Sequence, residues 1–178
     1  VRRITPLPFA SADNRNYLHL GLGLRRVGDD AGQMRFSGRP ESNVADKYLD
    51  TGNFTANYAR QLSLEAIWSR GPIMLAAEHV DAWVDAPQNG DPHFHGTYLM
   101  AAWVLTGESR IYNRALGYAS GIGPYGRAGA FELVTRYSWV DLDDGSIDGG
   151  NLGKWHFGAN WWMTRQLKLG VGYGDADL

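Results

Sequence analysis

The stretch GAFELVTRYSWVDLDDGSIDGGNLGKWHFGANWWMTRQLKLGVGY, residues 129–173, alternates apolar and polar side chains in three successive runs. Successive residues of a β-strand point to opposite sides, so each run has one apolar, aromatic face and one face of charged, small and glycine residues. In the first run Phe131, Leu133 and Tyr137 lie on one side, opposite Glu132 and Arg136. The pattern predicts three antiparallel strands joined by turns.

Strand length and aromatic placement extend this prediction. Each run covers about 9 to 11 residues, the length of a tilted strand that crosses a bilayer, and aromatic residues gather toward the run ends. A soluble antiparallel sheet packed on a core produces the same period of two. A small soluble barrel, however, fills its interior with side chains, whereas this polar face offers glycine, small residues and charges, which suit water. We therefore predict an all-β fold, an antiparallel transmembrane β-barrel.

Composition agrees with this fold class. No apolar run approaches the roughly 18 residues of a membrane helix, and the mean hydropathy is −0.34, because alternating strands do not register as hydrophobic segments. The chain has no Cys, which excludes disulfides, thiolate metal sites and a Cys nucleophile. It starts at Val1, and its first residues hold no apolar run of signal-peptide length. We expect the sequence to be a piece of a longer precursor.

The rest of the chain repeats the alternation. Residues 17–27, 61–69, 73–84 and 97–105 read as further strands, which gives about seven or eight antiparallel strands in all. We expect a single partial β-barrel domain over residues 1–178, with loops near 28–58, 85–95, 110–127 and 141–153. The first of these loops is expected to face outward, and the segment from residue 110 to fold into the lumen or to lie at its mouth.

Several segments together resemble a known family. They are MLAAE (74–78), GTYLMAAWVLTGESRIY (96–112), GAFELVTRYS (129–138) with DLDDG (141–145), and the GG of 149–150 that leads into GANWW (158–162). Their order and spacing resemble the C-terminal half of the phosphate-selective porins O and P of Gram-negative outer membranes.

This resemblance implies an up-and-down barrel of about 16 strands, of which the chain would be a fragment. It also implies an outer-membrane location in contact with lipid, a homotrimer, and passive diffusion of small anions such as phosphate or polyphosphate. Neither a cofactor nor a nucleic-acid partner is implied. No nucleophile elbow or related motif is present, so we expect no enzyme.

The charged residues of the inner face bear on the anion preference. An anion pore needs cationic side chains along a constriction, where low-dielectric walls strengthen each charge. The alternation places four cations on the inner face, namely Arg25, Arg136, Lys154 and Lys168, and we predict that they line the anion pathway. It places Glu65, Glu78 and Glu132 there too, as a lumen charge network. Glu132 and Arg136 lie about 13 Å apart along one strand, so each is expected to pair with a neighbouring strand.

Alternatives stay open. The chain holds only three Lys and has a net charge of −2, so a general, non-selective porin is one alternative to a phosphate-selective one. A soluble β-barrel that binds a ligand on its aromatic residues is another, and a non-conducting segment that serves assembly is a third. Asp91, His93 and His95 form a weak candidate metal site. We favour chance histidines in a solvated loop and predict no metal.

Overall fold

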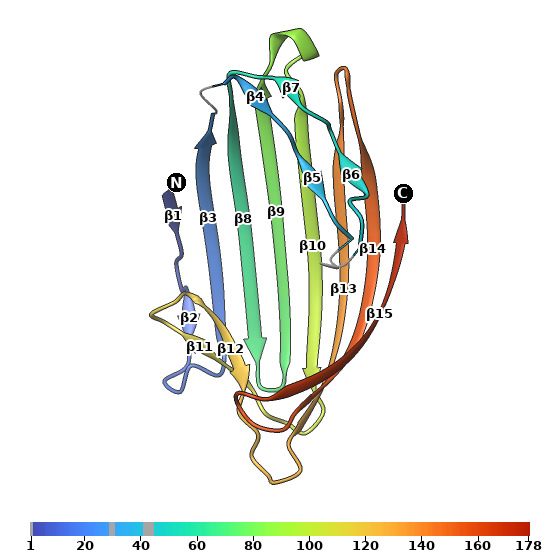
Figure 1. Cartoon of the computed structure of the whole chain (residues 1–178). Coiled ribbons are helices and arrows are strands. Elements are labelled where there is room, and N and C mark those ends of the chain that lie inside the picture. Colours follow the sequence, from blue (N-terminus) through green and yellow to red (C-terminus); the bar gives the residue numbers. More distant parts are fainter. Residues whose placement is uncertain (1, 29–30, 41–44) are drawn as a thin grey trace.

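The computed structural model describes residues 2–28, 31–40 and 45–178, and its elements are almost all β-strands (Figure 1). One antiparallel sheet runs in the order β1–β3–β8–β9–β10–β13–β14–β15, and its two edge strands do not pair with each other. Its long strands are β3 (Tyr17–Val27), β8 (Tyr58–Arg70), β9 (Ile73–Asp85), β10 (His93–Val104), β13 (Ala130–Asp144), β14 (Ile147–Trp162) and β15 (Lys168–Asp177). Two short strands, β1 (Arg2–Ile4) and β2 (Phe9–Ala10), both pair with β3. The predicted all-β, antiparallel fold is confirmed, as an open, curved sheet.

Helix is almost absent from the described residues. They contain one helix, the three-residue 3-10 turn η1 (Pro87–Asn89) between β9 and β10. Within the same residues, no helix has the length and apolar character needed to cross a membrane.

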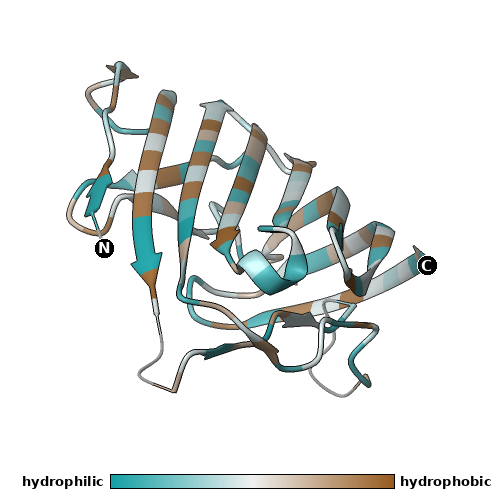
Figure 2. Cartoon of the chain, turned by 90° about the horizontal axis from the view of Figure 1, so that it is seen from above, coloured by the Kyte–Doolittle hydropathy of each residue, from teal (hydrophilic) through white to brown (hydrophobic). Residues whose placement is uncertain are grey.

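The strand register fixes two faces of the sheet. We call the face on which segments 31–40, 45–57 and 105–129 lie the inner face, and the opposite one the outer face. Arg136 pairs with Met100 and His156, and its neighbour Tyr137 pairs with Leu99 and Trp155, so the first trio shares the inner face and the second the outer face. Figure 2 shows the resulting alternation of hydrophilic and hydrophobic bands along the strands.

Large apolar side chains of the outer face are exposed. Leu99, Trp103 and Phe157 each retain about half of their accessible surface, at 57%, 52% and 51%. Others on this face are Leu22, Leu24, Leu64, Trp68, Leu75, Phe131, Leu133, Trp155, Trp161, Leu169, Val171 and Tyr173. Water-soluble monomers rarely expose apolar patches this extensive, whereas a lipid-facing barrel wall has this surface. The arrangement argues against a soluble sheet whose apolar face packs on a core.

The described part of segment 28–57, residues 31–40 and 45–57, lies over the inner face. It contains two short antiparallel pairs, β4 (Gln33–Met34) with β7 (Phe54–Thr55) and β5 (Ser37–Gly38) with β6 (Leu49–Asp50). Phe54 and Leu49 are buried in one cluster with Phe94, Leu142 and Leu152 of the sheet. That this loop faces the outside of the cell stays a prediction, because the packing shows only that it lies against the inner face. Its few apolar residues, scattered among polar ones, lose their contact with water only by packing on the wall.

Segment 105–129 also lies against the inner face, at the opposite end of the strands (Figure 1). It holds the hairpin of β11 (Arg110–Asn113) and β12 (Tyr118–Ile122). Ile122 is fully buried in a small cluster with Val104 and Ala130, against which Trp162 packs. The hairpin thus packs on the inner face beside the ends of β10, β13 and β14, a place compatible with both positions predicted for this segment.

Two predicted loops are much shorter than expected. Strand β10 begins at His93, so His93 and His95 belong to a strand and pair with Trp83 and Asp81. The predicted loop at 141–153 is a tight turn between Asp144 and Ile147. Polar residues suggested loops there, but strands that extend beyond the apolar band carry polar side chains in water while their backbone ladder continues.

Candidate functional site

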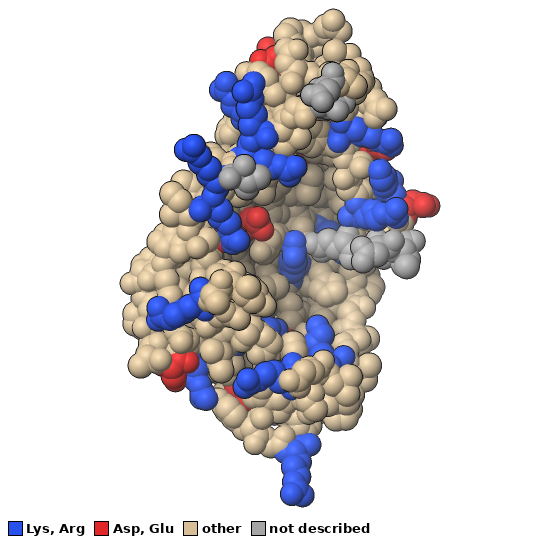
Figure 3. All heavy atoms as spheres, turned by 60° about the vertical axis from the view of Figure 1, so that its left-hand side comes forward, with Lys and Arg blue, Asp and Glu red and all other residues tan. Residues whose placement is uncertain are grey.

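Charges of both signs lie on the inner face. The carboxylates Glu65, Glu78 and Glu132 are on β8, β9 and β13, and the cations Arg136, Lys154 and Lys168 are on β13, β14 and β15. The register shows this as a cross-strand row of successive Cα partners, Glu65, Glu78, Tyr98, Ser138 and Lys154. The hollow side of the molecule, with lysine and arginine side chains around it, is seen in Figure 3.

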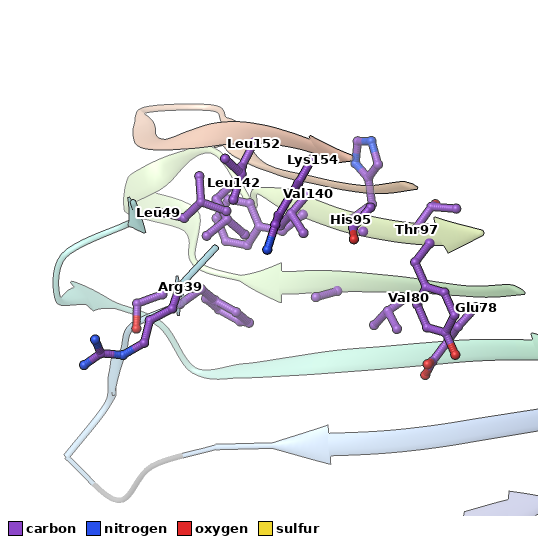
Figure 4. A pocket seen from close by; sticks show the side chains of 18 of the residues that line it. Arg39, Leu49, Glu78, Val80, His95, Thr97, Val140, Leu142, Leu152 and Lys154 are labelled. Atoms are coloured by element: carbon purple, nitrogen blue, oxygen red, sulfur yellow. The ribbon is translucent and has the colours of Figure 1, made fainter. Parts of the chain in front are cut away.

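A first cavity of about 460 Å³ separates the inward segment near β5 from the sheet (Figure 4). Its charged lining residues are Arg39, Glu78, Arg136 and Lys154. Lys154 is only 9% exposed, and its Nζ donates a hydrogen bond to the Pro40 carbonyl at 2.5 Å. Lys154 therefore also fastens the inward segment to the wall.

A second cavity of about 610 Å³ lies against β13, β14 and β15. Arg110, Arg136, His156 and Lys168 line it, and among the described residues no carboxylate lines it. Its floor contains glycine. A Cβ at Gly172 would lie 2.6 Å from Cε1 of His156, so this glycine makes room for the imidazole. Arg136 lines both cavities.

The guanidinium of Arg136 is held in place by its neighbours. It lies 3.9 Å from the centroid of the Tyr98 ring, and its Nε donates to Ser138 Oγ at 3.3 Å. Stacking on an aromatic face and a hydrogen bond to a neighbouring side chain hold a guanidinium in one place. Arg136 is thus a positive charge in a defined position on the inner face.

Glu132 is the buried centre of a separate network. Its side chain is fully buried, and Oε1 accepts hydrogen bonds from Arg110 Nε at 3.1 Å and Nη2 at 2.5 Å. Oε2 accepts from Asn160 Nδ2 at 2.9 Å and Trp162 Nε1 at 3.1 Å. The carboxylate thus anchors the β11–β12 hairpin to the wall. Its cationic partner is a residue of that hairpin, while Asn160 is the contact on a neighbouring strand.

Glu65 belongs to a second anchor of the same hairpin. It is paired with Arg3 and with Nε2 of the fully buried His19, at 2.7 Å, while His19 Nδ1 is 2.6 Å from the Tyr112 hydroxyl. Gly21 makes this possible, because a Cβ there would lie 2.3 Å from Cγ of Glu65. The hairpin is therefore fixed on β3 as well as on β13.

The remaining predicted cations are less enclosed. Lys168 is exposed, with its Nζ 5.3 Å from the centroid of the Trp162 ring. Arg25 is exposed near the end of β3, with Gln61 as its Cα partner. Thus Arg136, Lys154 and Lys168 lie around the two cavities, and Arg25 lines neither.

The weak metal candidate is not assembled. Asp91 lies in the turn, where its Oδ1 accepts the Ala86 amide at 2.8 Å. His93 and His95 are on β10, and Nε2 of His93 is 2.8 Å from Asp81 Oδ1. Within residues 2–28, 31–40 and 45–178, no group of three or more His, Asp or Glu could hold a metal ion.

Three inner-face residues were not selected from the sequence. Arg39 and Arg110 belong to the inward segments, and the alternation of apolar and polar residues does not predict where those segments lie. His156 is on the inner face by alternation, and its signal was the glycine-rich β15 beside it.

A tether outside the long strands shapes the inward segment. Arg35 binds Asp50 with two nitrogens, of which Nε is 2.7 Å from Oδ1. Hydrogen bonds from Arg35 and from the Gly52 amide lower the pKa of Asp50 to about 2. This carboxylate therefore stays ionised and paired at neutral pH.

Comparisons with known proteins agree with this architecture. Residues 8–177 match the family model described as phosphate-selective porin O and P. Porin O of Pseudomonas aeruginosa is 27% identical over 175 residues, which cover 87% of this chain and 38% of Porin O. An uncharacterized protein of Caulobacter vibrioides is 28% identical over 180 residues, covering 95% of this chain and 36% of that protein. The chain spans a little over a third of the length of these relatives.

Proposed function

Because the chain belongs to the phosphate-selective porin O and P family, we propose that it forms part of an outer-membrane porin that passes small anions by passive diffusion. Phosphate and polyphosphate are the candidate solutes, and a homotrimer in contact with outer-membrane lipid is the candidate assembly. Family membership points to a channel and not to an enzyme.

The observation that carries the proposal is the position of Arg136. It lines both cavities, and the described residues that line the second include the cations Arg110, Arg136 and Lys168 but no carboxylate, although Arg110 is paired with the buried Glu132. An anion about 6 Å from a guanidinium gains about 0.7 kcal/mol in water and about 2.8 kcal/mol at an effective dielectric constant of 20. These energies correspond to a local anion concentration about threefold to hundredfold above that in bulk solution. Only solutes that the inward segments bring close to the wall are enriched in this way.

Pairing of the inner-face carboxylates supports the same preference. Glu65 is paired with Arg3, and Glu132 with Arg110. A paired carboxylate repels a passing anion less than an isolated one, because the opposite charge beside it cancels most of its field. The same cancellation applies to Arg110, so Arg136 and Lys168 are expected to set the potential at the second cavity, whereas Glu78 also contributes at the first.

A general porin is the second candidate function. Glu78 lines the first cavity together with Arg136, and the chain as a whole carries a net charge of −2. Such a mixed lining would pass small solutes of either sign with weak preference.

The test is the reversal potential of the protein that carries this sequence, in planar bilayers under a salt gradient. Arg136→Glu should shift the reversal potential toward cations. Arg70→Glu is the matched control, because it changes the net charge equally on the outer face, where Arg70 pairs with Ile73. An Arg136→Glu channel with unaltered selectivity would remove Arg136 from the pathway, and block of the current by phosphate would separate the phosphate-selective from the general porin.

A further inference from the structure

The outer face carries an apolar groove of about 460 Å³ across β8, β9, β10 and β13. Small side chains form its floor in two adjacent cross-strand rows: Ala66 pairs with Ala77, and Ala101 pairs with Thr135. Trp68 and Trp155 stand among the residues that line it. The groove is thus a depression, floored by small residues, in an otherwise bulky aromatic surface.

The groove leads to a polar cluster on the same face. Two residues beyond Ala77 on β9 is His79, whose Nδ1 is 2.6 Å from Thr97 Oγ1 and whose Nε2 is 3.1 Å from Asp81 Oδ2. His93 Nε2 binds the other oxygen of Asp81 at 2.8 Å. Ionisable groups are expensive in the hydrocarbon layer, so these side chains satisfy one another, and the end of the cluster away from the groove, Asp81 and His93, is expected to approach headgroup level.

A row of rings supports that placement. Trp83 stacks on His93 at 5.1 Å between ring centroids, His93 on His95 at 5.5 Å, and His95 contacts Trp139 at 4.7 Å. The row crosses β9, β10 and β13. Amphipathic rings gather where hydrocarbon meets headgroups.

Two arginines continue the same row toward β3. Arg60 is the Cα partner of Trp83 on one side and of Arg26 on the other. Both guanidiniums lie over the Tyr58 ring, at 4.1 Å for Arg26 and 5.2 Å for Arg60. Like charges directly opposite each other in a sheet repel. The carboxylate of Asp85 interacts electrostatically with both arginines. A phosphate at this pair would relieve the repulsion.

The spacing fits one amphipathic molecule. Arg60 and Ala66 are six residues apart on one strand, about 20 Å at 3.4 Å per residue. Because barrel strands tilt by about 35–45°, this is about 14–17 Å along the membrane normal, close to half of the roughly 30 Å hydrocarbon core. A lipid tail in the groove therefore puts a phosphate within reach of the arginine pair.

We propose that this outer-face groove is a binding site for a phosphate-bearing acyl lipid. Its tail lies over Ala66, Ala77 and Ala101, and its phosphate binds Arg26 and Arg60 beside the histidine cluster. The inference rests on the lipid-facing outer wall of the proposed porin but not on its anion preference, which reversal potentials measure separately.

The test is lipid retention. The protein that carries this sequence is loaded from vesicles of phosphatidylcholine with a minor fraction of phosphatidylglycerol, exchanged into detergent, and examined by native mass spectrometry for bound phosphatidylglycerol. Ala101→Leu fills the groove and Arg60→Gln removes one phosphate ligand. Each should lower retention about tenfold. Ala159→Leu and Arg70→Gln make the same changes on the same face outside the site, and both should retain lipid like the parent.

Equal retention by all variants would overturn the proposal, because the bound lipid would then be a non-specific shell. Dissociation of an oligomer by Ala101→Leu, with no lipid in the parent protein, would also overturn it and would assign the groove to a second copy of the chain. Arg60 is exposed, so the Arg60→Gln variant should fold. If Ala101→Leu fails to fold, Arg60→Gln alone still tests the proposal.

Discussion

Replacing Glu132 with Ala should release the β11–β12 hairpin from the wall. The carboxylate is fully buried and accepts hydrogen bonds from Arg110, Asn160 and Trp162. Removing one partner of a buried ion pair costs about 3–5 kcal/mol, because the remaining charge stays desolvated. Glu132→Gln keeps one acceptor oxygen for Arg110 but turns an amide NH₂ toward two N–H donors. It should cost about 1–3 kcal/mol, the penalty of unsatisfied buried donors.

The assay is urea unfolding of the reconstituted protein, followed by tryptophan fluorescence, alongside single-channel recording. A destabilised hairpin should also appear as larger open-channel noise. Glu78→Ala is the control, since it removes a carboxylate from the same face without breaking any contact of Glu132. Its cost should stay below about 1 kcal/mol.

A double-mutant cycle decides whether the pair itself is responsible. Glu132→Ala and Arg110→Ala should show a coupling energy of about 1–3 kcal/mol. If Glu132→Ala costs no more than Glu78→Ala and leaves the channel noise unchanged, the hairpin is not anchored as described.

Two further results follow from the inward segment and the second cavity. The Arg35 contact lowers the pKa of Asp50 to about 2. The stability that this ion pair contributes is therefore fully present above about pH 4, the pKa of Asp in an unfolded chain, and is lost as the pH falls toward 2. Proteolysis of segment 28–57 should become faster between pH 4 and pH 2, and Asp50→Asn should abolish this pH dependence. Gly172→Ala should displace the His156 ring, since the new Cβ would lie 2.6 Å from Cε1, whereas a Cβ at Gly126 meets nothing within 4 Å. Conductance should fall for Gly172→Ala and not for Gly126→Ala; equal conductances would exclude His156 from the wall of the pathway.

The two faces of the sheet could be predicted from the sequence because side-chain direction in a strand depends only on residue parity. Once one strand is recognised, the faces of Arg136, Lys154 and Lys168 follow, and the register bears this out. Strand ends were harder, because His93 and His95 are polar and resemble loop residues although the backbone ladder includes them.

The inward segments could not be predicted, because their positions depend on contacts between residues far apart in the chain. Leu49 and Phe54 are isolated apolar residues in a polar stretch, and only the curved wall around Phe94 shows where they pack. The ion pair of Arg110 with Glu132 is missed for the same reason. Local periodicity places Glu132 on the inner face but contains no information on which segment crosses it.

The most direct test of the central claim is the sign of the reversal potential of the unmodified protein in a potassium chloride gradient. The cations that line the second cavity predict an anion-selective channel, with a chloride current that falls when phosphate is added. A cation-selective channel would contradict the account, because the carboxylates of β8 and β9 would then dominate the potential along the pathway.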